Sequence, residues 1–83
     1  MTAIIESISY TTDNLCLGFR GGWRHDCYHV APRDVTTIHT AADGVSAEVP
    51  LEVGRDVEFV LARDGGNMIA SLRTIPTMEE GQP

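Results

Sequence analysis

The feature of this sequence that most constrains its fold is a run of turn-forming residues between two apolar segments in the last third of the chain. These residues, Asp64, Gly65, Gly66 and Asn67, tolerate the positive φ angles that a tight turn between twisted strands requires. In residues 56–61, just before them, apolar side chains alternate with charged ones, which is the pattern of a strand with one buried face. The segment therefore predicts a β-hairpin that belongs to a small antiparallel sheet or barrel.

The length and composition of the chain indicate one small globular domain. A chain of 83 residues buries only about 60% of the surface that it exposes when unfolded, so there is no room for a second lobe. No apolar run approaches the roughly 20 residues that a membrane helix needs. The first residues hold no basic stretch followed by a long apolar core, so no secretory signal is visible and we expect a cytoplasmic location without a membrane partner.

Turn-forming residues divide the rest of the chain into short extended segments. Alternation and β-branched residues predict three further strands, over residues 3–10, 15–20 and 25–30. Pro32 ends the last of these, and one short helical turn is expected over residues 32–35. The long connection that follows, residues 36–50, holds turn formers and is expected to contain a short extra hairpin.

Three strands in a meander, a long loop and a closing hairpin fit an all-β fold, the small five-stranded antiparallel OB-like barrel. An SH3-like barrel is the nearest alternative. We expect residues 1–75 to form the barrel and residues 76–83 to form a flexible acidic tail. The side chains predicted to lie in the barrel core are Ile5, Ile8, Phe59, Leu61, Ile69 and Leu72.

The charge of the chain is negative and unevenly spread. Twelve acidic residues stand against six basic ones, all of them arginine, so the net charge is −6 and general attraction to phosphate is weak. Arginines outnumber acids only in residues 14–41, so any anion-binding surface is expected there. The alternative is that the asymmetry is ordinary solvated surface.

The second and third predicted strands carry two short motifs that resemble those of a known family. The first motif is Cys16-Leu17-Gly18-Phe19, with Tyr10 standing seven residues before Leu17, and the second is Asp26-Cys27-Tyr28-His29-Val30. Together with the closing hairpin, they resemble the cold-shock domain, a five-stranded OB barrel that stacks single-stranded bases on aromatic side chains. The resemblance covers most of residues 3–75, and Leu17 stands where the family has a stacking aromatic.

The resemblance and the local excess of arginine together suggest a binding face. The face is expected to consist of Tyr10, Phe19, Arg20, Trp23, Arg24 and Tyr28. On this interpretation the protein is a small non-enzymatic regulatory module that binds single-stranded RNA or DNA weakly, as a monomer or a strand-edge homodimer. Two alternatives stay open: the aromatic residues belong to the core, and the chain is an acidic interaction or inhibitor module that docks on a basic protein.

The histidines and cysteines raise the question of a metal site. His25, Cys27 and His29 alternate and would share one face of a strand, with Cys16 or His39 able to complete a tetrahedral ligand set. No second pair with the usual metal-ligand spacing supports this set, and no nucleophile motif surrounds either cysteine. We therefore expect no metal, no cofactor and no enzymatic activity, and two free thiols rather than a bridge.

Overall fold

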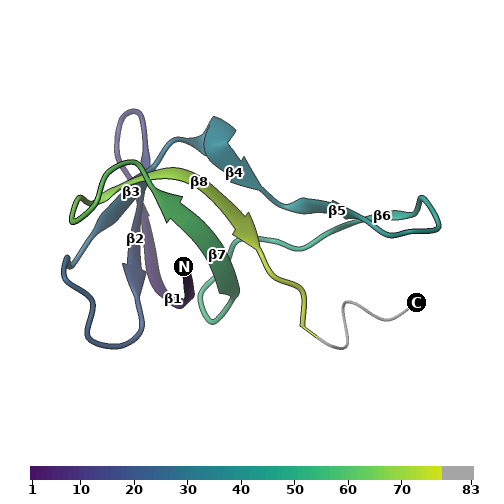
Figure 1. The fold of residues 1–83 in the computed structure, drawn as a ribbon, viewed down its shortest axis with the longest axis horizontal. Helices are drawn as coiled ribbons and strands as arrows, with labels where there is room; N and C mark the ends of the chain where they lie inside the picture. The colour runs from purple at the N-terminus through teal and green to yellow at the C-terminus, as the bar shows by residue number, and fades with distance from the viewer. Residues whose placement is uncertain (78–83) are drawn as a thin grey trace.

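The computed structural model describes residues 1–77 of the chain, and nearly all of its regular structure is β (Figure 1). Within this range no helix is long and apolar enough to cross a membrane. In chain order the elements are β1 (Thr2–Tyr10), β2 (Leu15–Phe19), β3 (Tyr28–Val30), the 3-10 turn η1 (Pro32–Asp34), β4 (Val35–Thr36), β5 (Ile38–Thr40), β6 (Ser46–Glu48), β7 (Asp56–Leu61) and β8 (Met68–Thr74).

Five of the strands close into a barrel, which confirms the predicted all-β class. β1 pairs with β2 and β7, β2 pairs with β3, and β7 pairs with β8, all antiparallel. β3 then pairs with β8 in parallel, His29 lying opposite Met68 and Val30 opposite Ile69. The expectation of a wholly antiparallel barrel is therefore wrong, because five strands in a closed ring cannot all run opposite to both neighbours. The order is consistent with an OB-like barrel, and the parallel closure separates it from an antiparallel meander.

The long first strand reaches the core twice because it contains a bulge. Ile5 lies opposite Phe19 and Ile8 lies opposite Leu17, and the register shifts between Ile5 and Ser7. In a regular strand, residues three apart point to opposite faces. The extra residue at the bulge turns Ile8 back toward the interior, where it packs against the core.

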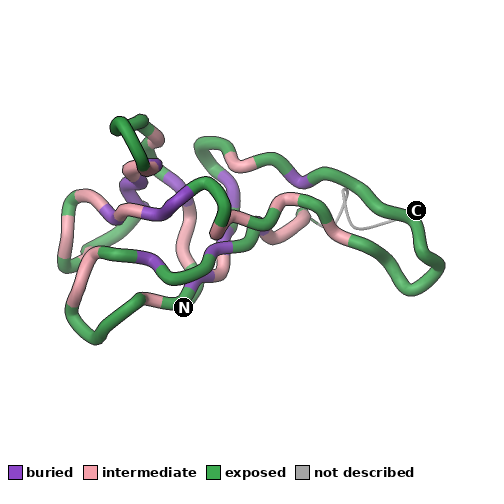
Figure 2. The backbone as a smooth tube through the Cα atoms, turned by 90° about the horizontal axis from the view of Figure 1, so that it is seen from above, coloured by how far each residue is buried: buried purple, intermediate pink, exposed green. Residues whose placement is uncertain are grey.

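The barrel interior holds the core that the hairpin periodicity predicted. Ile5, Phe59, Ile69 and Leu72 are buried, whereas Ile8 and Leu61 are partly buried against them. Figure 2 shows the buried backbone positions concentrated within the barrel. The structure adds further buried side chains to this cluster, namely Leu15, Leu17, Phe19, Tyr28, Val30 and Val57.

The connection between β3 and β7 contains both of the expected local elements. The 3-10 turn η1 forms where proline starts it, and β4 then pairs in parallel with β8. The extra hairpin is formed by β5 and β6, whose two-stranded sheet is separate from the barrel. This hairpin, residues 38–48, projects from the barrel and lengthens the molecule to 38 Å against 24 and 23 Å in the other directions (Figure 1). We call it the arm.

The third strand is shorter than the sequence predicts. The third strand begins at Tyr28 rather than at residue 25, because the preceding loop bends so that the His25 ring meets the carbonyl of Gly65 at 2.8 Å. Of the expected flexible tail over residues 76–83, residues 78–83 lie outside the described part of the chain.

Candidate functional site

The predicted binding face is divided between the core and two distant ends of the barrel. Phe19 and Tyr28 are 5% and 2% exposed, and the Phe19 ring stacks on Phe59 with the ring centroids 4.8 Å apart. Tyr10 lies at one end of β1 and is 79% exposed, whereas Arg20 follows β2 at the opposite end. β2 has five residues, so these ends are roughly 17 Å apart.

The outer face of β2 and β3 carries sulfur and imidazole rather than aromatic rings. Leu17 and Phe19, which the sequence resemblance assigned to stacking positions, point into the barrel, so Cys16 and Gly18 face outward. The side-chain period of a strand is two residues, and a change of one residue exchanges its faces. In β2 the three large apolar side chains, Leu15, Leu17 and Phe19, therefore point to the barrel interior.

Three of the predicted residues do come together, in the lining of a cleft between two loops. Trp23 is half-buried, packs on Phe19 with the ring centroids 5.4 Å apart, and donates its indole N–H to the carbonyl of Arg20 at 2.9 Å. The cleft lies between residues 22–25 and the β7–β8 loop and has a volume of about 270 Å³. Trp23, Arg24 and Tyr28 line it, so we call it the loop cleft.

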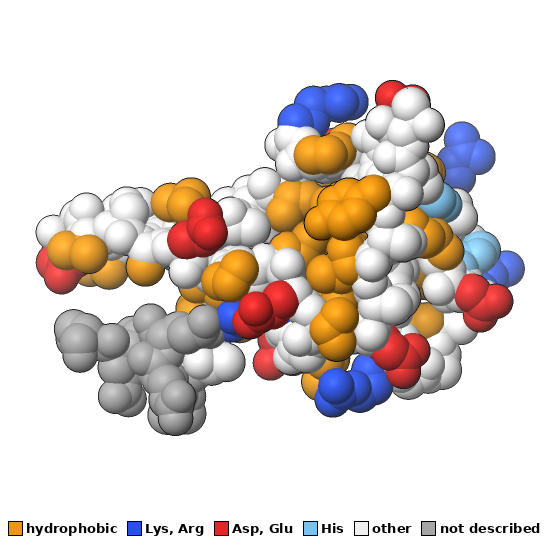
Figure 3. Space-filling view, turned by 180° about the vertical axis from the view of Figure 1, so that it is seen from behind, with side chains coloured by type: hydrophobic (Ala, Val, Ile, Leu, Met, Phe, Trp, Pro, Cys, Tyr) orange, Lys and Arg blue, Asp and Glu red, His pale blue; other side chains and the backbone are white. Residues whose placement is uncertain are grey.

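A shallower groove lies beside Tyr10, between the β1–β2 turn and the segment that follows β3. Its volume is about 540 Å³. Its walls combine apolar side chains with the polar β1–β2 turn, in which Thr11 Oγ1 donates to the Asn14 carbonyl at 3.0 Å. Figure 3 shows hydrophobic side chains gathered on one face of the barrel, with charged side chains spread around them. The apolar residues that line the groove are Tyr10, Leu15, Pro32, Val35 and Leu51.

The arm is fixed to the barrel at its base and exposed along its length. The Thr74 hydroxyl, fully buried in β8, donates to the carbonyl of Val49 at 2.6 Å, and His39 Nε2 lies 3.2 Å from Thr74 Oγ1. Beyond this base the arm exposes Ile38 (53%) and Val45 (63%). Figure 2 shows most of its backbone as exposed.

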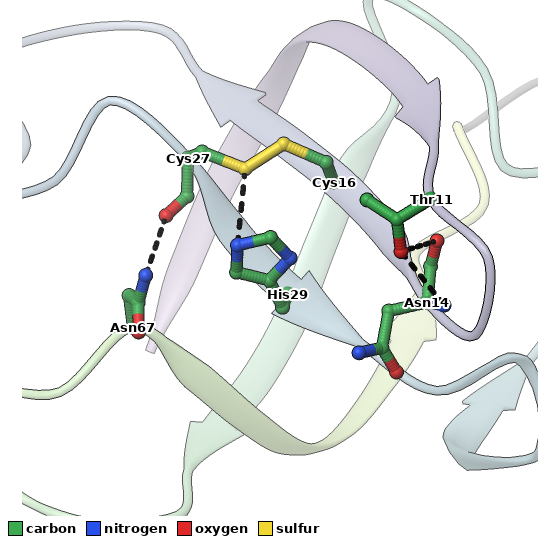
Figure 4. The surroundings of a disulfide bond; sticks show 6 residues. All are labelled: Thr11, Asn14, Cys16, Cys27, His29 and Asn67. Carbon is green, nitrogen blue, oxygen red and sulfur yellow. Dashed lines mark hydrogen bonds between the residues drawn. A yellow bond between two sulfur atoms is a disulfide. The ribbon is translucent and has the colours of Figure 1, made fainter.

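Cys16 and Cys27 form a disulfide, so the expectation of two free thiols is wrong. Their Cα atoms lie 5.7 Å apart, within the range that a disulfide spans. The pairing of β2 with β3 brings both residues to one outer face, and this proximity does not depend on the cell compartment from which free thiols were expected. His29 Nε2 lies 3.6 Å from the Cys27 sulfur, and the amide of Asn67 donates to the Cys27 carbonyl at 3.4 Å (Figure 4).

This Cys–His cluster, Cys16, Cys27 and His29, is the one group of metal-ligand side chains that lies close together within residues 1–77. Their ligand atoms are all within 4.8 Å of one another. His25 and His39, the other histidines considered from the sequence, bind Gly65 and Thr74 instead. In the sequence, the sign of this cluster was the alternation of histidine and cysteine in residues 25–29. That alternation could identify the cluster only after the structure had shown which side chains of β2 and β3 face outward and how the two strands are paired.

No protein-family model, no curated protein and no solved structure matches this chain.

Proposed function

We propose that this protein is a small non-enzymatic interaction module, and that its arm docks on a basic protein partner. The observation that carries this proposal is the arm's geometry. Within the described residues, no other strand pairs with β5 or β6, so each presents one unpaired edge. Such edges are templates for a strand of another protein, and β-strand addition is a common mode of recognition.

The arm has little reason to be stable by itself. An isolated two-stranded hairpin is marginal in water, because it buries too little apolar surface. Ile38 and Val45 are more than half exposed, and every residue of β6 is exposed. A partner that covers these side chains would supply the missing burial, at about 25 cal/mol for each Å² of apolar surface removed from water.

Charge decides the kind of partner. Residues 38–48 hold Asp43 and Glu48 and no arginine, and the whole chain has a net charge of −6. A second copy would bring the same charge to the interface, and this repulsion opposes pairing of two arms. A basic protein is attracted instead, which speeds the encounter and selects the partner.

The test compares arm variants with a matched surface variant. Ile38→Asn and Val45→Asn each remove an exposed apolar side chain from the arm, and Val60→Asn removes one of similar exposure (58%) from β7 of the barrel. Each variant is used to capture proteins from a native-host lysate. We then identify the proteins that wild type and the Val60→Asn control retain and that the arm variants do not retain. Each is then purified and its binding is measured by calorimetry.

We expect at least one such protein to be basic, to bind the purified wild type, and to lose about tenfold in affinity, which is about 1.4 kcal/mol, with either arm variant. Its affinity should also fall with salt. The proposal fails if every purified binder has the same affinity for the arm variants and for Val60→Asn. It also fails if the protein associates through the arm only with itself, as light scattering would show.

A second candidate function, weak binding of single-stranded nucleic acid, is supported by the loop cleft. Trp23 keeps part of its ring exposed there, and Arg24 lies over Gly65 at the other wall. Arg20 and Arg63 are in the two loops that border the cleft, so positive charge is locally available in a negative protein. Arginine beside an aromatic ring is the usual composition of a base-stacking site, and the cold-shock resemblance leads to the same ligand class.

The anisotropy of a labelled single-stranded oligonucleotide tests this second candidate. With three arginines available, the logarithm of the affinity should fall with the logarithm of salt concentration with a slope of roughly −2. Arg24→Ala should weaken oligonucleotide binding. Arg33 lies in η1 and does not line the cleft, so Arg33→Ala should leave binding unchanged. No anisotropy change at low salt and high micromolar protein would exclude this function.

A further inference from the structure

We propose that the Cys–His cluster is a binding site for a zinc-type divalent ion when its disulfide is reduced. The site lies on the outer face of β2 and β3, and none of its three residues belongs to the arm or to the lining of the loop cleft. It departs from our expectation, based on the sequence, that the chain holds no metal site. The proposal does not depend on the interaction function, because none of its three residues belongs to the arm.

The pairing of β2 with β3 places the three ligands before any ion binds. Cys16 lies directly opposite His29 in the antiparallel register, so their side chains leave the sheet side by side. Cys27 stands two residues before His29 and therefore points to the same face (Figure 4). The backbone N–H of His29 donates to the backbone carbonyl of Asn67 at 2.8 Å, and the side-chain amide of Asn67 donates to the Cys27 carbonyl, so the β7–β8 loop holds both residues in place.

The distance between Cys27 and His29 matches a tetrahedral metal site. Zinc binds sulfur at about 2.3 Å and imidazole nitrogen at about 2.0–2.1 Å, so two such ligands at a tetrahedral angle lie about 3.6 Å apart. The distance from Cys27 Sγ to His29 Nε2 is 3.6 Å. The third ligand atom, Cys16 Sγ, lies within 4.8 Å of the imidazole nitrogen. Reduction of the disulfide frees the two sulfurs to separate to about 3.8 Å, as two thiolates on one tetrahedral zinc require, so side-chain rotations can bring all three atoms onto one ion.

The donor types select the ion. Two thiolates and one imidazole suit zinc, and the two negative charges of the thiolates balance a divalent cation without any further charged group. All three residues are partly exposed, so an ion can reach them from solvent. Three protein ligands leave the fourth position of the tetrahedron for water or for a group of another molecule.

The disulfide and the metal exclude each other. In the oxidised form both sulfurs are bonded to each other and neither is a thiolate. Reduction by a pair of small-molecule thiols transfers two electrons and two protons to the bond, which leaves Cys16 and Cys27 as thiols and the donors as their own disulfide. Each thiol then loses its proton as the ion binds. Metal binding is therefore expected only under reducing conditions.

The experiment uses cobalt as a spectroscopic substitute for zinc. The full chain is reduced with a phosphine, its thiols are counted, and Co²⁺ is added while the absorbance is recorded. We expect one equivalent to produce thiolate-to-cobalt charge-transfer bands and the visible bands of tetrahedral cobalt, and zinc to displace them. The oxidised protein should give neither. Zinc should also raise the melting temperature of the reduced chain by several degrees.

Variants separate this site from adventitious binding. Cys16→Ser and Cys27→Ser should each weaken the charge-transfer bands, the double variant should abolish them, and His29→Gln should reduce the affinity by at least about tenfold. His25→Gln is the matched control, because its imidazole binds the Gly65 carbonyl outside the cluster. The proposal is overturned if the reduced wild type gives no charge-transfer band. It is equally overturned if the double variant binds cobalt as tightly as wild type, or if the sulfurs resist reduction in the folded protein.

Discussion

The hydroxyl of Thr74 offers the most direct test of how the arm is held on the barrel. It is fully buried and donates to the carbonyl of Val49, where the chain leaves β6, while His39 Nε2 of β5 lies 3.2 Å from the hydroxyl oxygen of Thr74. The amide of Val49 in turn donates to the Thr37 carbonyl at 2.7 Å. Replacing Thr74 by valine keeps the shape of the side chain and removes only the polar group.

The loss of stability expected for Thr74→Val follows from the burial of the Val49 carbonyl, which accepts the hydroxyl's hydrogen bond. Val49 is 2% exposed, so its carbonyl loses a partner that water cannot replace, which costs about 1–3 kcal/mol. The added methyl group recovers up to about 0.8 kcal/mol through apolar burial. The net loss should be about 1–2 kcal/mol. A chain of this size has a stability of about 4–12 kcal/mol, so the variant stays folded.

Urea denaturation measures this loss, and amide exchange locates it. With a slope near 1 kcal/mol per molar urea for a small chain, the unfolding midpoint of Thr74→Val should fall by roughly 1–2 M. Amides of β5 and β6 should exchange faster, and amides of β7 much less so. Thr2→Val, at an exposed position of β1, is the control and should change stability by less than about 0.5 kcal/mol. The reasoning is refuted if Thr74→Val unfolds at the same urea concentration as this control.

Three further predictions concern the turn, the core and the crosslink. Gly65 has a φ of 75°, so Gly65→Ala should lower the free energy of unfolding by about 1 kcal/mol or more. At Gly22 an added Cβ meets nothing within 4 Å, so Gly22→Ala should leave the stability unchanged or raise it slightly. Equal urea midpoints for the two variants would contradict this. Phe59→Ala should lose about 3–5 kcal/mol, measured by thermal melting, because Phe59 is 1% exposed at the centre of the aromatic cluster. Reducing the Cys16–Cys27 bond in metal-free buffer should lower the free energy of unfolding by roughly 3 kcal/mol, because the bond joins residues 11 apart in sequence and so restricts the unfolded chain. An unchanged melting temperature, after a thiol count has confirmed reduction, would argue against this prediction.

Local patterns predicted much of the fold. The alternation in residues 56–61 identified a strand with Val57 and Phe59 buried, and the turn residues after it identified the β7–β8 hairpin. Pro32 predicted the position of η1, and the turn formers after it predicted the extra hairpin. These features depend on residues that are neighbours in the sequence, so the sequence alone contains the information that sets them.

The candidate sites depended on contacts between distant segments, and there the sequence was ambiguous. The motif around Phe19 is compatible with either facing of β2, and only the closed barrel, in which Phe19 stacks on Phe59, selects the inward one. The same choice turns Cys16 outward beside His29 and so creates the Cys–His cluster. The sequence determined which segments are extended and where they turn, because backbone preference is local. The tertiary structure decided which face each strand presents, because that choice depends on filling one shared interior.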